Sequence, residues 1–249
     1  MNDSRTPPLI PQPAPAGVPA AQGAPAPPVA DPEDFAPIPN VFAAIESILR
    51  QRRRVMFQLR QPGSARLIAA MLFTSVVCSL IYGVIVGTFS GGVQFWAAPV
   101  KVAAGLLISA LICLPSLYIF ACLSGSQARL FEVVGLVAGL LLLMTVLLIG
   151  FAPVAWVFSQ STESVAAMGA LHVAFWFIST CFGIRFLNAG FAQQSRSGDG
   201  LKVWTVIFLL VMAQMTAALR PIVGTADTFL PTEKKFFVTH WLDTLKRAR

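Results

Sequence analysis

Five long runs of apolar residues follow one another along the chain, and none of them contains Asp, Glu, Lys or Arg. The runs are Leu67–Val100, Val102–Ala128, Val133–Thr162, Ser164–Ile184 and Val203–Leu219. A helix that spans a bilayer needs about 20 mostly apolar residues. The pattern therefore predicts an all-α, polytopic membrane protein. Its membrane domain covers residues 62–224, with transmembrane helices at about 67–87, 98–123, 130–157, 165–188 and 201–219.

The fifth run is the shortest and leaves an alternative open. Val203–Leu219 is close to the minimum of about 17 residues that a spanning helix needs. If this segment is re-entrant, the protein has four spans and both ends of the chain face the cytoplasm. We expect a full span, and therefore five.

An amphipathic helix is predicted over residues 41–61, before the first span. Val41, Ile45, Ile48, Val55 and Leu59 recur on one side, and Asn40 can cap the helix start. Four arginines cluster in the middle of this segment: Arg50, Arg52, Arg53 and Arg54. Arg52 breaks the pattern because it falls on the apolar side. We expect an interfacial helix whose arginines contact anionic lipids. The alternative is a helix packed on the cytosolic ends of the bundle.

The two ends of the chain differ from the membrane domain. Residues 1–40 hold twelve of the eighteen prolines, which exclude regular helix and sheet, so a disordered Pro/Ala-rich tail is expected. Pro8–Pro11 and Pro25–Pro28 fit the spacing of a polyproline ligand for a protein partner, a pattern that composition alone also produces. The C-terminal tail, 225–249, contains FFVTHWLDTLKR, a second candidate interfacial helix.

Composition and charge agree with a membrane protein and orient it. Charged residues make up 12% of the chain, against about 25% in soluble domains. Residues 1–49 carry five acidic residues and Arg5, so the basic excess falls beside the spans, where it indicates orientation and anionic-lipid contact rather than nucleic-acid binding. The basic flank before residue 67 predicts a cytoplasmic N-terminus. Five spans then place the C-terminus on the extracytoplasmic side, and we expect the cell (plasma) membrane.

Few side chains in the spans are ionisable or strongly polar. His172 and Gln214 are the candidate functional polar residues, because ionisable and polar groups are costly in lipid. A hydrogen bond from His172 to a facing helix is the simpler interpretation, and a proton, metal or gating role is the other. No acidic residue lies at mid-bilayer, which disfavours a coupled carrier. No motif for a cofactor, a metal or a catalytic nucleophile is present, and the four cysteines have no metal-site spacing.

Small residues at intervals of four predict close helix packing. Gly135 and Gly139 form one such pair, and Ser179 and Gly183 form another.

The layout resembles the Yip-type five-span membrane proteins. The stretch Cys122–Leu143, CLSGSQARLFEVVGLVAGLLLL, looks like that family's segment in which a small polar loop opens the third span. The resemblance covers residues 41–220 by pattern. The chain lacks the Asp-Leu-Tyr-Gly-Pro type motif of eukaryotic members, and its C-terminal tail is longer. The resemblance implies a non-enzymatic role in membrane organisation or trafficking.

The sequence therefore predicts a non-enzymatic membrane scaffold or adaptor that binds partners in the membrane and through its N-terminal tail. The alternative is a channel or transporter subunit. The third hypothesis is a lipid-modifying enzyme that uses His172. The lack of a nearby acid or nucleophile in the sequence argues against it.

Overall fold

The computed structural model describes residues 32–162, 164–192 and 199–219, and this part of the chain is all-helical. Its elements are η1 (Pro32–Phe35), α1 (Val41–Arg50), α2 (Arg52–Leu59), α3 (Ala65–Ser90), α4 (Gln94–Leu123), α5 (Leu130–Ser161), α6 (Val165–Ala192) and α7 (Asp199–Ala218). Helices α3 to α7 are long and apolar enough to cross a membrane, which confirms the predicted fold class. The proline pairs of the N-terminal tail and the C-terminal candidate helix lie outside the described residues.

The spanning helices extend beyond the predicted windows. Helix α4 begins four residues early, at Gln94, and α5 continues through Pro153 to Ser161. Three residues join α3 to α4, and two of them, Gly91 and Gly92, have φ values of 66° and 54°. Glycine adopts such values without strain, so the chain can reverse in this short link.

Helix α7 is continuous over its 20 residues. At 1.5 Å per residue it is about 30 Å long, which matches the hydrocarbon thickness of a bilayer. A re-entrant segment needs a break that α7 does not have, so the five-span alternative is the one that the helix geometry supports.

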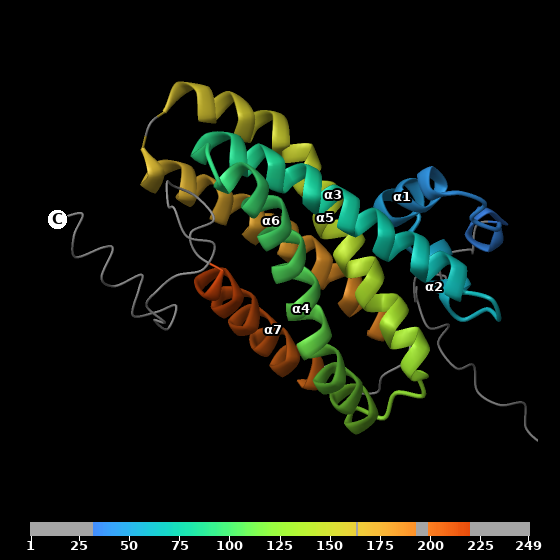
Figure 1. Cartoon of the computed structure of the whole chain (residues 1–249). Helices are drawn as coiled ribbons and strands as arrows, with labels where there is room; N and C mark the ends of the chain where they lie inside the picture. Colours follow the sequence, from blue (N-terminus) through green and yellow to red (C-terminus); the bar gives the residue numbers. More distant parts are fainter. Residues whose placement is uncertain (1–31, 163, 193–198, 220–249) are drawn as a thin grey trace, which may run out of the picture.

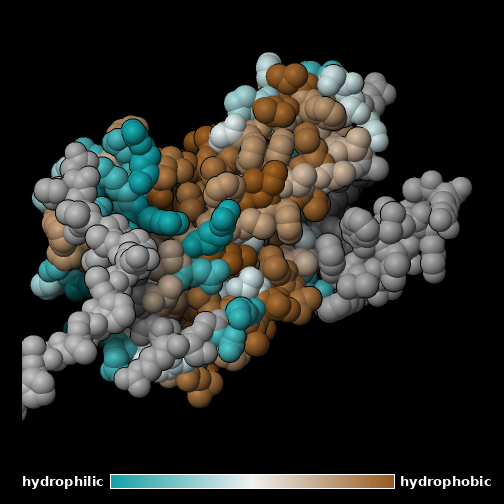
Figure 2. Space-filling model, turned by 180° about the vertical axis from the view of Figure 1, so that it is seen from behind, coloured by the Kyte–Doolittle hydropathy of each residue, from teal (hydrophilic) through white to brown (hydrophobic). Residues whose placement is uncertain are grey.

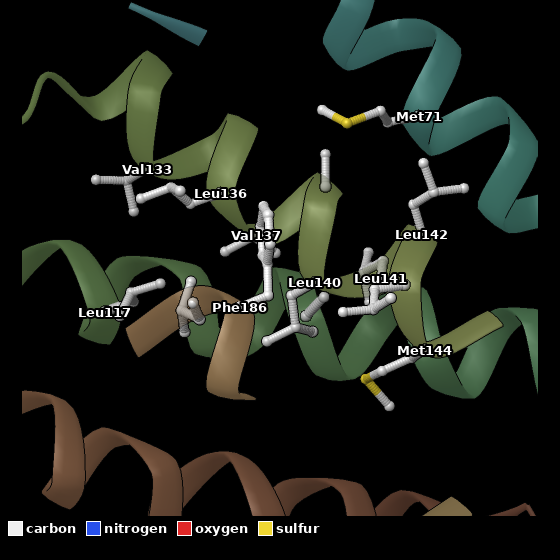
Figure 3. Close-up of a cluster of buried hydrophobic side chains, with 14 of the residues drawn as sticks. Met71, Leu117, Val133, Leu136, Val137, Leu140, Leu141, Leu142, Met144 and Phe186 are labelled. Carbon is white, nitrogen blue, oxygen red and sulfur yellow. The ribbon is translucent and has the colours of Figure 1, made fainter. Parts of the chain in front are cut away.

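Helix α5 lies at the centre of the bundle (Figure 1). In its most apolar stretch, 72% of the residues are buried inside the protein, whereas the other four spans reach 39% at most. It packs against α3 and α6, while α4 packs against α3 and α7. Figure 3 shows side chains of α5 meeting Met71 of α3, Leu117 of α4 and Phe186 of α6.

Glycines let the other elements approach α5. A Cβ at Gly139 would lie 2.5 Å from the Phe186 ring, and one at Gly135 would lie 2.6 Å from Leu59. Gly183 likewise receives Met144, at 2.8 Å from a Cβ placed there. The predicted packing role of these glycines therefore has a geometric basis. Ser179 is fully buried, and its hydroxyl has no hydrogen-bond partner among the described residues.

One helix contact is made directly between backbones. A Cβ on Gly83 of α3 would overlap Pro99 Cα of α4, and one on Gly87 would lie 3.0 Å from Phe95 Cα. Gly83 and Gly87 are four residues apart, the spacing that allows two backbones to touch in membranes. This pair fixes α3 against the first two turns of α4.

The segment before the first span is two helices instead of the single helix that we predicted over residues 41–61. Asn40 caps α1 as expected, since its Oδ1 accepts a hydrogen bond from the Ala43 amide at 2.8 Å. The helix breaks at Gln51 (φ −122°, ψ 52°). In a straight helix Arg52 would follow Ile48 by four residues and share its buried face. The break lets Arg52 stay exposed while Ile48 remains buried.

Helices α1 and α2 pack on the bundle through one apolar side. The buried residues Ile48, Val55, Met56 and Leu59 belong to the same hydrophobic core as α5. This side therefore fits the alternative of a helix packed on the end of the bundle. The other side carries exposed residues, among them Phe42 and Leu49. We call η1, α1 and α2 together the platform. Figure 2 shows hydrophilic residues gathered at this end of the molecule, beside a hydrophobic band across the spans.

We predict that Gly83→Ala destabilises the bundle by about 1–3 kcal/mol, the usual cost of overpacking. The added methyl would meet backbone atoms of Pro99, which cannot move aside as a side chain can. Thermal unfolding of the detergent-solubilised protein measures the effect. Gly150→Ala is the matched control, because a Cβ there meets nothing within 4 Å. Equal unfolding midpoints for the two variants would contradict the backbone contact.

Candidate functional site

A cluster of buried polar side chains lies at the end of the bundle where α3 ends and α4 and α6 begin. Tyr82 of α3 is completely buried, Lys101 of α4 is 1% exposed and His172 of α6 is 6% exposed. Burying such groups in an apolar bundle costs free energy unless they are hydrogen-bonded or paired. Their burial therefore marks this cluster as the candidate site of the membrane domain.

The three residues lie at similar depth. Lys101 follows the start of α4 by seven residues, and His172 follows the start of α6 by seven. At 1.5 Å per residue each is about 10 Å from the helix end. Helix α4 is about 45 Å long by the same rise, against a hydrocarbon core of about 30 Å. The cluster therefore lies just inside the hydrocarbon boundary.

Tyr82 and His172 form an interhelical hydrogen bond. The Tyr82 hydroxyl lies 2.7 Å from Nδ1 of His172, and the rings meet edge to face with centroids 5.6 Å apart. This confirms the simpler interpretation of His172, a hydrogen bond to a facing helix. The other ring nitrogen, Nε2, is buried and has no hydrogen-bond partner among the described residues.

Lys101 lies deeper in its helix than the predicted span, 98–123, would place it. Because α4 begins at Gln94, Lys101 lies two turns into the helix and faces the interior. Its Nζ donates a hydrogen bond to Oε1 of Gln94 at 3.3 Å. Gln94 is itself buried, so α4 brings a cation and an amide to the protein interior at this end.

A cavity of about 50 Å³ adjoins the cluster, between α4, α6 and α7. Its lining includes Lys101, His172, Trp176, Met212, Met215 and Thr216. Most of the remaining wall is aliphatic. The cavity therefore combines one cationic and one imidazole group with an apolar surround.

Gln214, the second polar candidate, is half-buried on α7. It does not line the cavity, although the next two residues, Met215 and Thr216, do. The structure thus brings His172 and Lys101 to one cavity and leaves Gln214 out of it. No group of three or more His, Cys, Asp or Glu side chains that could hold a metal ion occurs in the described part of the chain.

The four predicted lipid-contact arginines fall into two groups. Arg50, Arg52 and Arg53 are exposed on the platform, and Arg50 makes a surface ion pair with Glu46 at 3.7 Å. Arg54 is half-buried. Its guanidinium donates to the carbonyl oxygens of Ala36 at 2.9 Å and of Pro37 at 2.7 Å.

Arg54 thereby ties the segment before α1 to α2. Gln58 adds two hydrogen bonds, to the Ala36 oxygen at 2.7 Å and from the Ile38 amide at 3.2 Å. The rings of Phe35 and Phe57 meet edge to face with centroids 4.9 Å apart. Residues 35–38 therefore have a fixed structure, although we expected disorder up to residue 40.

Sequence reasoning named neither Tyr82 nor Lys101 as a candidate site residue. A signal existed for both: Tyr82 interrupts an apolar run next to Gly83, and Lys101 is the one charge between Leu67 and Ala128. What was missing was the early start of α4, which an apolar window does not mark because Gln94 is polar.

Comparisons of the chain with protein-family models, with curated proteins and with solved structures gave no match.

We predict that Tyr82→Phe lowers the free energy of unfolding by about 1 kcal/mol, within the range measured for interhelical hydrogen bonds in membranes. The change removes the hydroxyl and leaves Nδ1 of His172 buried without that partner. Tyr118→Phe, on the half-buried tyrosine of α4, is the control. Unfolding in detergent measures both variants, and equal effects would contradict a stabilising Tyr82–His172 bond.

Proposed function

We propose that this chain is a non-enzymatic membrane scaffold or adaptor whose platform presents a binding surface at one end of a packed five-helix bundle. The observation that carries the proposal is the two-sided construction of α1 and α2. One side is buried in the core of the bundle through Ile48, Val55 and Leu59, and the other is exposed. A rigid exposed surface on a membrane anchor is what a scaffold requires.

The exposed side of the platform mixes aromatic, aliphatic and basic residues. Phe42 is 83% exposed and Leu49 48%, and Arg52 and Arg53 lie nearby in sequence on α2. Aromatic residues and arginines are enriched in protein interfaces. An acidic segment with apolar side chains is the partner that this chemistry fits, and anionic lipid headgroups fit the arginines alone.

The interior supports an adaptor over a channel or transporter subunit. Helix α5 fills the centre of the bundle with leucines, among them Leu140, Leu141 and Leu142, each at most 1% exposed. A conducting path through one copy needs polar groups or water along the axis. The channel or transporter alternative is favoured by one observation, the cavity beside Lys101 and His172.

An enzymatic role has little support in the site. His172 bonds to Tyr82, and no hydrogen bond or ion pair joins it to a carboxylate or thiol in the part of the chain that the structure describes. A catalytic base normally works beside a nucleophile or an orienting acid.

The orientation follows from charge. The platform carries the arginines before the first span, so the positive-inside rule places it in the cytoplasm and the Lys101 end on the outer side. We propose the plasma membrane, with the C-terminus extracytoplasmic. The resemblance to Yip-type proteins stays a prediction that agrees with a scaffold role.

A photo-crosslinking amino acid at Phe42 tests the scaffold proposal. We expect discrete protein adducts at this exposed platform position. Phe73 of α3, which is 69% exposed on a span, is the matched control and is expected to give lipid adducts. Arg52→Glu with Arg53→Glu is expected to weaken the Phe42 adducts. Lipid adducts alone at both positions, or solute flux through proteoliposomes above that of empty vesicles, would favour the alternatives.

Single cysteines in the links test the orientation. In a background without the four native cysteines, Val93→Cys lies between α3 and α4, and Gln127→Cys lies between α4 and α5. An impermeant thiol reagent added to intact cells is expected to label position 93 and to spare position 127. The reverse pattern would place the platform outside the cell.

A further inference from the structure

His172 lines the cavity beside Lys101, and its hydrogen bond with Tyr82 shows which of its two ring nitrogens carries the proton. Tyr82 is fully buried and has one hydroxyl proton, and Nδ1 of His172 is the acceptor found for it among the described residues. A buried donor without an acceptor is costly, so the hydroxyl donates to Nδ1. The ring proton of the neutral imidazole then sits on Nε2.

Nε2 is therefore a buried donor on a residue that lines the cavity. It is buried, it belongs to a side chain that is 6% exposed, and no described residue accepts its hydrogen bond. The Tyr82 bond and the edge-to-face ring contact hold the imidazole in place. An acceptor that enters the cavity would complete this site without rearrangement of the ring.

Lys101 supplies positive charge to the same cavity. Its side chain is buried in α4 and lines the cavity together with His172. Its ammonium group donates a hydrogen bond to Gln94 at 3.3 Å. A donor and a cation that converge on one cavity favour an anionic oxygen ligand, because charge-assisted hydrogen bonds are stronger than neutral ones.

The size of the cavity restricts what can enter. One water needs about 10–15 Å³ of such volume, so about 50 Å³ admits a few waters or a single carboxylate or phosphate group. The wall beyond the polar residues includes Met212, Met215 and Trp176. Methionine side chains are flexible and adapt to apolar ligands, so an attached hydrocarbon chain can be accommodated beside the polar residues.

We propose that the cavity between α4, α6 and α7 is an oxyanion-binding site, in which Lys101 and Nε2 of His172 hold a carboxylate or phosphate group just inside the outer hydrocarbon boundary. The group belongs to an anionic amphiphile or to a small soluble anion. This site goes beyond the scaffold role and does not depend on it, since the platform lies at the other end of the bundle.

The test uses the full chain reconstituted in neutral phosphatidylcholine nanodiscs. One arm adds a long-chain fatty acid with a photoreactive diazirine and maps adducts by mass spectrometry, with the matching fatty alcohol as the uncharged probe. A second arm adds inorganic phosphate, against potassium chloride of equal ionic strength, and follows the thermal unfolding midpoint. Excess unlabelled fatty acid competes in the first arm.

Lys101→Met removes the charge and keeps the length of the side chain, and Lys202→Met is the control, because Lys202 is exposed at the other end of α7. His172→Phe removes the donor. Met215→Trp fills the cavity while leaving both polar residues, so the proposal stays testable if a polar variant misfolds. We expect adducts on α6 and α7 cavity residues that fall at least tenfold in the three cavity variants and stay unchanged in Lys202→Met.

The two arms distinguish the sources of the anion. Specific fatty-acid adducts without a phosphate effect identify an amphiphile, and a phosphate-dependent rise in the midpoint that Lys101→Met abolishes identifies a soluble anion. Equal labelling by the fatty acid and the alcohol, or labelling that Lys101→Met leaves unchanged, would overturn the proposal if phosphate also has no effect.

Discussion

The contact on which the membrane domain depends is the backbone approach of α3 and α4 at Gly83 and Pro99. Without side chains between them, the two helices fix each other's depth and rotation. Tyr82 adjoins Gly83 in sequence, and Lys101 follows Pro99 by two residues, so the same contact sets where the hydroxyl and the ammonium group lie. Proline at this position adds to the fit, because it lacks an amide hydrogen and its φ is fixed. A packing contact and a candidate binding site are thus products of one short stretch of each helix.

Around this contact the bundle separates apolar and polar residues along its length. Helix α5 is apolar on all sides over most of its length and is buried as a central helix. The buried polar residues Tyr82, Lys101 and His172 gather at one end, and the exposed arginines of α1 and α2 lie at the other. Such a distribution keeps the middle of the membrane free of charge, where solvation is poorest. The two ends can therefore differ in what they bind without interfering with each other.

The fold was largely predictable from the sequence, and the site was not. An apolar run long enough to cross the membrane must satisfy its backbone hydrogen bonds internally, which a helix does. The existence and order of α3 to α7 could therefore be predicted directly. Helix ends did not follow, because a polar residue such as Gln94 can start a helix that an apolar window omits. The early start places Lys101 two turns into α4 instead of within its first turn. The break at Gln51 and the bond between Tyr82 and His172 depend on which helices become neighbours, and a single sequence does not contain that information directly.

Helix α7 joins the bundle by way of α4, and this has a consequence for biogenesis. The indole nitrogen of Trp204 donates to the carbonyl oxygen of Cys113 at 2.9 Å, across 91 positions of the chain. During synthesis the surface of α4 that receives Trp204 must face lipid, or a helper protein, until α7 leaves the ribosome and the insertion machinery. Helix α7 also forms one wall of the cavity, through Met212 and Met215. The cavity therefore cannot form before α7 has packed against α4, so occupancy of the site reports that α7 has joined the bundle.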